Sequence, residues 1–319
     1  MKLLVTGGMG FIGSNFIRHM LNNYPKLQIV NLDKLTYAGN PNNLLDLKGN
    51  KRHAFVKGDI CNRKIVERAM KGCDTVVNFA AETHVDRSIT DPYSFINTDV
   101  FGTYTLADVA AKQKIRKFVH ISTDEVYGSR EKGSFSEEDK LEPSSPYSAS
   151  KASGDMIVNS YIVTKNLQAS IVRPSNNFGP YQYPEKIMPL FITNLLQGKK
   201  VPLYGDGKNV RDWLFVIDNC RAIEKVLFKG NVGKIYNIAG GNEIQNVKLT
   251  KMILDGLNLD DSYIQKVKDR PGHDRRYSIT SGKIRKLGWK PWWKFRDALA
   301  YTIEWYAMNH LWWKPLLKG

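Results

Sequence analysis

The chain has 319 residues, of which 42% are hydrophobic and 24% charged, as is typical of a globular protein that buries one large core or two lobes. It holds no apolar run near the roughly 20 residues of a membrane span, and its first strand meets a glycine turn too early for a signal peptide, so we expect a cytoplasmic protein without membrane contact. The net charge of +16 is spread along the chain without a basic arm, which favours an anionic small ligand over nucleic acid.

Strands and helices alternate through the first half of the chain. Apolar runs predict strands at residues 2–6, 27–32, 53–57, 75–79, 118–122 and 169–173. Helical spacing of apolar residues predicts helices at 14–22, 64–70, 97–111 and 148–164. This alternation predicts an α/β fold, a doubly wound parallel sheet of the Rossmann type with right-handed crossovers.

Beyond Pro174 the alternation loosens, and further prolines predict an irregular segment that leaves the sheet. Strands at 213–216 and 234–238 are expected to return to that sheet, and helices are expected at 219–228 and 247–257. We therefore expect a Rossmann domain over residues 1–175, with strands returning from about 210–240, and a smaller interleaved lobe over 176–319 that mainly binds substrate.

A glycine-rich turn joins the first strand to the first helix. Gly7, Gly10 and Gly13 let a pyrophosphate approach the backbone and the helix N-terminus closely. Asp33 closes the next strand, where a carboxylate accepts hydrogen bonds from the ribose hydroxyls of NAD and repels the 2′-phosphate of NADP. NAD is therefore the expected cofactor of the first domain. Asp59, after the third strand, is expected at the adenine edge, with a plain surface turn as the alternative.

Two adjacent carboxylates, Asp124 and Glu125, follow the apolar run 118–122. The carboxyl ends of parallel strands are where open sheets bind ligands. Two acids at such an end can divide the work, one donating a proton and the other removing one. A solvated exit from the strand is the alternative for such a pair taken alone.

Tyr147 and Lys151 are four residues apart at the start of a helix, whose beginning is marked by serines and Pro146, so they share one helical face. A nearby ammonium stabilises a phenolate and lowers the tyrosine pKa from about 10. The pair then suits alcohol oxidation, with the lysine also holding the nicotinamide ribose. A chance pair on an amphipathic helix is the alternative, which the upstream glycine turn disfavours.

Together these motifs resemble the extended short-chain dehydrogenase/reductase family, and within it the nucleotide-sugar 4,6-dehydratases. The resemblance covers nearly the whole chain, and its most specific part is the acid pair after Ser122-Thr123. It rests on segments 6–14, 33–39, 80–88, 122–128, 173–181, 211–213 and 269–277, together with the tyrosine–lysine pair.

The resemblance implies dehydration of a nucleoside-diphosphate hexose, with dTDP-glucose as the expected substrate. Tyr147 is implied to take the proton of the sugar 4-hydroxyl while C4 gives hydride to NAD, and Lys151 to lower the pKa of Tyr147. Thr123 would hydrogen-bond the 4-oxygen. Glu125 would then remove the C5 proton and Asp124 would protonate the departing 6-hydroxyl, before the hydride returns to C6.

The resemblance also implies two sets of contacts. Those to the cofactor are Gly7, Gly10, Phe11, Ile12, Gly13, Asp33, Lys34, Leu35, Thr36, Asp59, Ile60, Phe79, Ala80, Ala81, Thr98, Tyr147, Lys151 and Asn177. Those to the substrate are Thr83, His84, Thr123, Asn176, Lys186, Ile187, Pro202, Leu203, Tyr204, Arg211, Asn246, Asp269, Arg270 and His273.

Some of these contacts keep open alternatives. Arg211 is expected to clamp the diphosphate through its bidentate fork, or else to form a surface salt bridge with Asp206 or Asp212. His84 is equally suited to a structural role, and Asn176 and Asn177 could be turn residues.

Further features bear on assembly. The three cysteines lack metal-ligand spacing and are expected to be free thiols, and no metal is expected. The resemblance implies a homodimer joined by a four-helix bundle, built from the helices that begin near Asn97 and Ser148. The tryptophan-rich region 289–313 is expected to pack a helix face on the core.

Two other functions remain open. A UDP-hexose 4-epimerase would need Tyr147 and Lys151 but not the acid pair. From a different class, the fold could serve as a non-catalytic NAD sensor or a nucleic-acid-binding protein, which would show salt-dependent DNA binding without sugar turnover.

Overall fold

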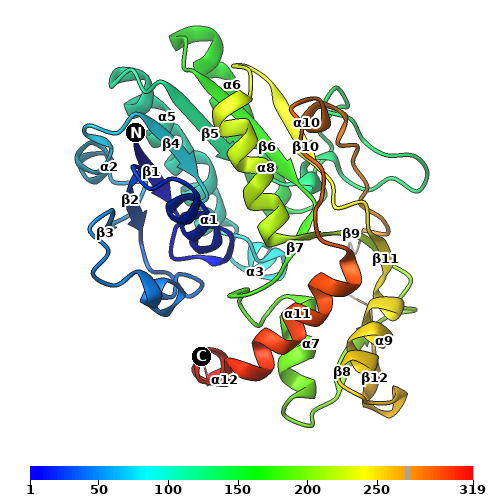
Figure 1. The fold of residues 1–319 in the computed structure, drawn as a ribbon. Helices are drawn as coiled ribbons and strands as arrows, with labels where there is room; N and C mark the ends of the chain where they lie inside the picture. Colours follow the sequence, from blue (N-terminus) through cyan, green and yellow to red (C-terminus); the bar gives the residue numbers. More distant parts are fainter. Residues whose placement is uncertain (270–273, 319) are drawn as a thin grey trace.

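The computed structural model describes residues 1–269 and 274–318, and its centre is a seven-stranded parallel sheet in the order β10-β6-β5-β4-β1-β2-β3 (Figure 1). Its strands are β1 Lys2–Thr6, β2 Gln28–Asp33, β3 His53–Lys57, β4 Thr75–Asn78, β5 Lys117–Ile121, β6 Ala169–Pro174 and β10 Ile235–Ile238. The predicted doubly wound sheet is confirmed. Since β1 is flanked by β2 and β4, the strand order reverses at β1, where such sheets bind ligands.

Helices cover both faces of this sheet. On one face α1 (Phe11–Asn23) packs against α8 (Val216–Lys229), and on the other α5 (Thr103–Lys112) packs against α2 (Arg63–Met70) and α6 (Pro146–Lys165). Alternation along β1 sends Leu3 and Val5 into the first core and Leu4 into the second. The sheet is therefore buried on both sides, which explains why its strands read as continuous apolar runs.

The predicted helix 97–111 is present, but its first turns are π-helical. Short helices α3 (Val85–Thr90) and α4 (Pro92–Phe95) lead into a π-helical turn, η2 (Ile96–Gly102), and only then does α5 begin. Turns of this kind occur often at functional sites. Elsewhere the structure starts helices slightly earlier than predicted: α6 begins at Pro146, where Ser145 and Ser148 form a capping box.

The later chain forms a second, smaller group of elements. A three-stranded sheet holds β7 (Asn176–Phe178), β9 (Val210–Phe215) and β11 (Glu243–Gln245), and a two-stranded sheet pairs β8 (Val201–Tyr204) with β12 (Ile264–Val267). The helices of this group are α7 Ile187–Leu195, α9 Asn246–Gly256, α10 Gly282–Lys286, α11 Phe295–Met308 and α12 His310–Trp313. The remaining 3-10 turns are η1 Pro41–Leu47, η3 Asp124–Tyr127, η4 Asp261–Tyr263 and η5 Lys314–Lys318.

One strand prediction is confirmed and one is wrong. Residues 235–238 return to the main sheet as β10, beside β6. Residues 213–216 were expected there too, but β9 pairs instead with β7 and β11. The reason is that the chain continues past Pro174 directly into β7, which offers β9 a parallel partner outside the main sheet.

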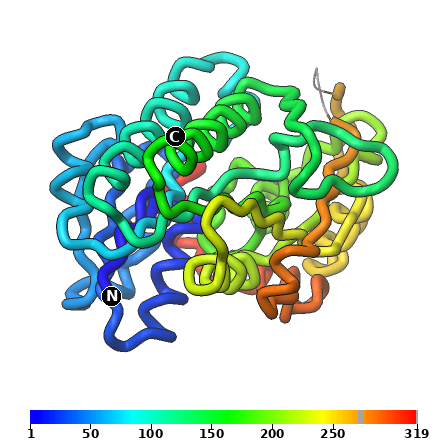
Figure 2. The backbone as a smooth tube through the Cα atoms, turned by 90° about the horizontal axis from the view of Figure 1, so that it is seen from above, coloured from blue at the N-terminus to red at the C-terminus, as the bar shows by residue number. Residues whose placement is uncertain are grey.

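The C-terminal end of the chain packs against elements of the first half. Seen from above, the blue and cyan first half lies to one side and the yellow and orange segments to the other (Figure 2). The C-terminal α12 returns to the first half, where the Trp312 indole donates to Asn43 Oδ1 at 2.8 Å and contacts the ring of Trp305. The tryptophan-rich region thus packs on the core as expected, although Trp292 remains exposed.

Candidate active site

A cavity of about 460 Å³ opens at the carboxyl ends of the central strands. It is lined from both halves of the chain. The predicted cofactor residues in its wall are Gly7, Gly10, Phe11, Ile12, Gly13, Asp33, Lys34, Thr36, Asp59, Ile60, Phe79, Ala80, Ala81, Thr98 and Asn177. The predicted catalytic and substrate residues there are Thr123, Asp124, Glu125, Tyr147, Lys151, Thr83, His84, Asn176, Lys186, Ile187, Tyr204, Arg211 and Asn246.

A few predicted residues lie elsewhere. Leu35, Pro202, Leu203 and Asp269 are not part of the lining of this cavity. Arg270 and His273 fall outside the residues that the structure describes. Tyr204, at the end of β8, does reach the cavity and is half-exposed there.

The glycine turn leaves the start of α1 open. A Cβ on Gly7, whose φ is +68°, would lie 2.6 Å from the Ala80 backbone nitrogen, and one on Gly13 would lie 2.4 Å from the Gly7 carbonyl oxygen. Gly10, the residue before α1, provides no side-chain cap. The backbone N–H groups of the first helical turn thus remain available to an anion, as a pyrophosphate requires.

Asp33 lies buried at the end of β2. Its two carboxylate oxygens accept hydrogen bonds from the backbone N–H groups of Met9 and Leu35, both at 2.8 Å. Burial raises the pKa of Asp33, against the lowering effect of these two bonds. Each oxygen keeps a second lone pair, so ribose hydroxyls can still bind. The open helix end, the glycines and Asp33 together fit a dinucleotide.

Lys34 and Asp59 form an ion pair at the rim of this region, with Lys34 Nζ 2.7 Å from Asp59 Oδ2. Asp59 also accepts the Cys61 backbone N–H. The Asp59 carboxylate is thus engaged within the protein, although both residues line the cavity.

Asp124 is a buried acid at the end of β5. Thr123 caps the turn η3, its Oγ1 accepting the Glu125 N–H at 3.2 Å and lying 3.3 Å from Asp124 Oδ1. Burial, then the charges of Glu125 and Asp212, raise the pKa of Asp124 well above its usual range, while Arg211 opposes them. These surroundings favour the protonated form of Asp124, the form that can donate a proton.

Tyr147 and Lys151 reach the cavity from the first turns of α6, and both are buried. Lys151 Nζ donates to the Ile121 carbonyl at 2.8 Å. Burial, then the charges of Glu125 and Asp99, raise the pKa of Tyr147 well above 10, against a hydrogen bond with Thr123. The lowering of this pKa by Lys151 stays a prediction, because burial and the nearby carboxylates dominate the shift in the protein alone.

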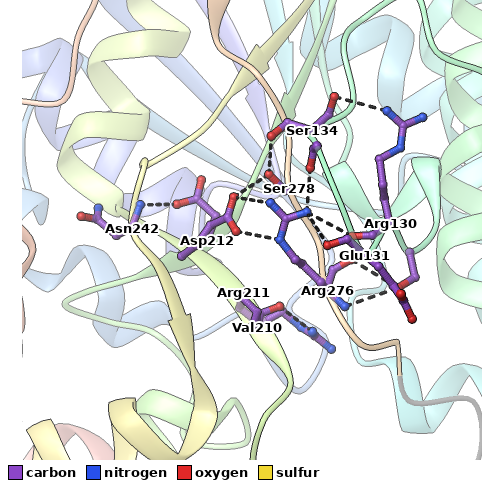
Figure 3. A network of polar contacts seen from close by, with 12 residues as sticks. Arg130, Glu131, Ser134, Val210, Arg211, Asp212, Asn242, Arg276 and Ser278 are labelled. Atoms are coloured by element: carbon purple, nitrogen blue, oxygen red, sulfur yellow. Dashed lines mark hydrogen bonds and ion pairs between the residues drawn. The ribbon is translucent and has the colours of Figure 1, made fainter.

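The diphosphate candidate Arg211 is buried on β9. Its guanidinium stacks 4.2 Å from the centroid of the Tyr277 ring and donates to the Val210 and Asp274 carbonyls. Asp206 pairs with Arg275 instead, so the alternative of an Arg211–Asp206 salt bridge is wrong. Figure 3 shows Arg211 beside Asp212, whose carboxylate accepts the Asn242 N–H.

His84 and Lys186 are both tied to the protein near the cavity. His84 caps α3, its Nδ1 accepting the Arg87 N–H at 3.2 Å, and its Nε2 lies 3.8 Å from a carboxylate oxygen of Glu185. Lys186 Nζ donates to the Thr83 carbonyl at 2.6 Å. His84 thus has the structural role that was open to it, while its ring also lines the cavity.

Several buried polar atoms in residues of the cavity wall have no hydrogen-bond partner among the described residues. They include Asp124 Oδ2, Asn176 Oδ1, Asn246 Oδ1 and the Trp213 indole nitrogen. Buried polar groups are seldom left unpaired in folded proteins. These atoms are positions where a polar ligand would supply the missing partners.

Sequence reasoning missed some residues of the cavity wall. Glu82 is one: burial and the charge of Asp99 raise its pKa to about 7. Tyr277 is another, and its ring supports Arg211. Both lie inside segments that carried the family resemblance, 80–88 and 269–277, so the motifs contained the signal.

The described residues show neither a membrane-spanning helix nor a metal-binding cluster. No helix among them is long and apolar enough to cross a membrane. They contain no group of three or more His, Cys, Asp or Glu that could hold a metal ion. All three cysteines are free thiols, as expected.

Comparison with known proteins gives a consistent result. The sequence profile of the GDP-mannose 4,6 dehydratase family matches residues 4–302. A dTDP-glucose 4,6-dehydratase of Streptomyces niveus is 47% identical over 321 residues, covering 99% of this chain and 96% of the relative.

Solved structures point to the same family as the sequence comparisons. A double mutant of DesIV, a dTDP-glucose 4,6-dehydratase of Streptomyces venezuelae with NAD and DAU bound, superposes with a TM-score of 0.97 at 50% identity, covering 99% of this chain and 100% of that one. A UDP-glucose 4-epimerase of Thermotoga maritima with UDP-glucose superposes with a TM-score of 0.91 but only 27% identity, over 97% of this chain and 100% of that one.

Proposed function

The chain belongs to the GDP-mannose 4,6 dehydratase family, and on that premise we propose that it is an NAD-dependent hydro-lyase that converts dTDP-glucose to dTDP-4-keto-6-deoxyglucose and water. One observation carries the proposal: the buried acid Asp124, with Glu125, lines the same cavity as Tyr147 and Lys151. Tyr147 and Lys151, which would oxidise the sugar, thus line the same cavity as Asp124 and Glu125, which would eliminate water.

For oxidation, Tyr147 takes the proton of the sugar 4-hydroxyl, and Thr123 donates a hydrogen bond to the 4-oxygen. Bound NAD would accept the C4 hydride and later return it to C6, so that the cofactor ends unchanged. The raised pKa of Tyr147 must fall for this step. Oxidised nicotinamide brings a positive charge to the cavity, which offsets the surrounding carboxylates.

For elimination, Glu125 removes the C5 proton, which the 4-keto group has made acidic. Asp124 gives its proton to the departing 6-hydroxyl, which leaves as water, and a C5–C6 double bond forms. The hydride then adds at C6 and a proton returns to C5. The raised pKa of Asp124 supports its role as the acid, since burial and the neighbouring charges favour its protonated form.

The two halves of the chain would divide the binding. Residues 1–175 would hold NAD through the glycine turn and Asp33, and residues 176–319 would hold the nucleotide sugar. Lys186 and Arg211 are the cations of this second part that line the cavity, and both suit a diphosphate. Asn176 and Asn246, with their unpaired amide oxygens, suit sugar or base donors.

The test is to incubate the purified protein separately with dTDP-glucose and UDP-glucose and to follow the alkaline chromophore of the 4-keto product. We expect the 4-keto product with both nucleotides, and a higher kcat/KM with dTDP-glucose. Galactose from UDP-glucose without any 4-keto product would instead identify a 4-epimerase. Intact NAD binding with no change in either sugar would contradict both enzymes.

We also propose that the protein is a homodimer. Exposed apolar side chains gather on α3, α4, η2 and α6, which contact one another: Ile89, Tyr93, Ile96, Phe101, Met156 and Val163. Such a patch marks an interaction surface. The occupant we assign is a second copy of this chain, because the patch includes the two helices implied by the family resemblance. A cytoplasmic location stays a prediction of the sequence, which cell fractionation would test.

A further inference from the structure

A buried carboxylate behind the active site has no part in the chemistry described so far. Asp99 lies in the π-helical turn η2, and its side chain is only 1% exposed. Its Oδ1 accepts the Glu82 backbone N–H at 2.9 Å, and its Oδ2 accepts the Ser150 hydroxyl at 2.8 Å. Burying such a group is costly, so its retention calls for a reason.

The two partners of Asp99 belong to different parts of the site. Glu82 continues the loop 80–82, whose residues line the cavity on the cofactor side. Ser150 precedes Lys151 on α6, and its hydroxyl also lies 2.8 Å from the Tyr147 carbonyl oxygen. One carboxylate thus fastens the cofactor loop to the helix that carries the oxidising pair.

The charge of Asp99 faces Lys151. The Lys151 ammonium is buried, and its hydrogen bond runs to the neutral carbonyl of Ile121. Burial raises the pKa of Asp99 to about 6, while Lys151 opposes this shift. Asp99 is therefore ionised at neutral pH and serves as a counter-charge to the ammonium.

The other charged groups around Lys151 do not replace Asp99. From α6, Asp155 pairs with Arg173 at 2.9 Å, so its charge is already compensated. From β5, His120 has its pKa lowered well below 6.5 by burial, Lys151 and Arg173, so it is neutral. From the loop after β4, Glu82 titrates with a pKa of about 7. The acids at the end of β5 face the cavity from the side of Tyr147.

We propose that Asp99 is a positioning residue for the oxidation step: it holds loop 80–82 against α6 and supplies a buried negative charge that favours the cationic, oxidised nicotinamide over the neutral, reduced one. The inference rests on the proposed function and extends it to the choice between the two redox forms of the cofactor. A charge with this role acts on binding even when no sugar is present.

The test is Asp99→Asn, which keeps the shape and lets the amide oxygen accept the Glu82 N–H while the amide nitrogen donates to Ser150. The measurement is the Kd of NAD⁺ and of NADH, by fluorescence, without sugar at about pH 8. Loss of one buried negative charge should weaken NAD⁺ binding relative to NADH by about five-fold. In the parent protein, the ratio of the two Kd values should change with pH near 6, where Asp99 titrates, and near 7, where Glu82 titrates. In Asp99→Asn the change near pH 6 should be absent, while the change near pH 7 should remain.

Two matched variants separate charge from structure. Ser150→Ala breaks the link to α6 without changing charge, so it should weaken both forms of the cofactor alike. Asp218→Asn removes another buried carboxylate, one that caps the Trp292 and Trp293 backbone away from this cavity, and should leave the Kd ratio unchanged.

A folded Asp99→Asn protein with the parent's Kd ratio would overturn the proposal. If that variant does not fold, Glu82→Gln takes its place, because this change removes the titration near pH 7. A Kd ratio of Glu82→Gln that does not change between about pH 5 and 7 would equally overturn the proposal. These outcomes are independent of sugar turnover. If the parent protein does not dehydrate the sugar but Asp99→Asn still alters the Kd ratio, the proposed function is rejected and the role of Asp99 in cofactor binding stands.

Discussion

At the scale of single residues, burial is what turns an ordinary carboxyl into a proton donor. Asp124 is 2% exposed and shares its surroundings with the charges of Glu125 and Asp212. Both effects disfavour the ionised form. Burial and the charge of Glu125 also raise the pKa of Tyr147, so in the protein alone both side chains favour their protonated forms.

The double variant Asp124→Asn, Glu125→Gln separates elimination from oxidation. Both amides preserve size and hydrogen bonding but neither exchanges a proton at neutral pH, so formation of the 4-keto-6-deoxy product should fall by about 10²–10⁴-fold. C4 oxidation should remain visible as a transient rise in NADH absorbance. Tyr147→Phe is the matched control and should lose that transient as well. Water loss at the parent's rate in the double variant would contradict the assigned roles.

The raised pKa of Asp99 predicts a pH-dependent stability. The group has a pKa of 3.8 when unfolded and about 6 when folded, so its contribution is fully present below pH 3.8 and is lost as the pH rises through about 6. The free energy of unfolding of the parent relative to Asp99→Asn should therefore decline over this range. Urea titrations at several pH values measure it, and a difference that does not vary with pH would contradict the shift.

Residue-level prediction worked where the signals were local. Asp33, Asp124 and Tyr147 each stand at a strand end or helix start that apolar spacing can locate, and all three line the cavity. Asp99 could not be recognised in this way. Its partners are 17 and 51 residues away in the sequence, and only the fold brings them together.

At the scale of elements, a single arginine joins three segments beside the substrate side of the cavity. Arg276 makes two hydrogen bonds to Glu243 of β11, at 2.7 and 2.9 Å, and one to the Gly133 carbonyl at 2.6 Å. Ser278 connects the same Glu243 to Ser134 (Figure 3). These bonds fix the segment around Arg276 to the loop that follows Asp124 and Glu125. The same segment carries Tyr277, whose ring stacks against Arg211.

Arg276→Ala should loosen this segment. We expect the KM for the nucleotide sugar to rise by about ten-fold with a smaller change in kcat, because the loss affects positioning of the substrate more than the reacting groups. The Kd of NAD should not change. Arg275→Ala is the matched control, since its ion pair with Asp206 is half-exposed and contributes little. Equal kinetic effects of the two variants would argue against a specific role for Arg276.

Prediction of elements succeeded for the main sheet and failed where partners or fine geometry mattered. The strand at 213–216 was recognisable as an apolar run, but its placement depended on β7, three residues long and hidden after Pro174. The π-helical segment Ile96–Gly102 is continuous with α5, so the helix predicted at 97–111 is present and the sequence missed only the wider hydrogen bonding of its first turns.

At the scale of the whole molecule, the exposed apolar patch on α3, α4, η2 and α6 predicts the oligomeric state. Met156→Glu places a charge within this patch, on α6, and should convert a dimer into a monomer because a buried unpaired charge is costly. Sedimentation at micromolar concentration measures the mass. Leu311→Glu, a change at another exposed apolar residue that lies outside the patch, should leave the dimer intact. A parent protein that sediments as a monomer would contradict the proposal.

The central claim, that one cavity performs both oxidation and elimination, is tested most directly by isotope transfer. The substrate is dTDP-glucose carrying deuterium at C4, and the product is analysed by NMR and mass spectrometry. If the hydride leaves C4, is held by the cofactor and returns after water is lost, the deuterium appears at C6 of the 4-keto-6-deoxy sugar, and C5 carries a solvent proton. Deuterium still at C4 of a hexose that keeps its 6-hydroxyl would contradict the account.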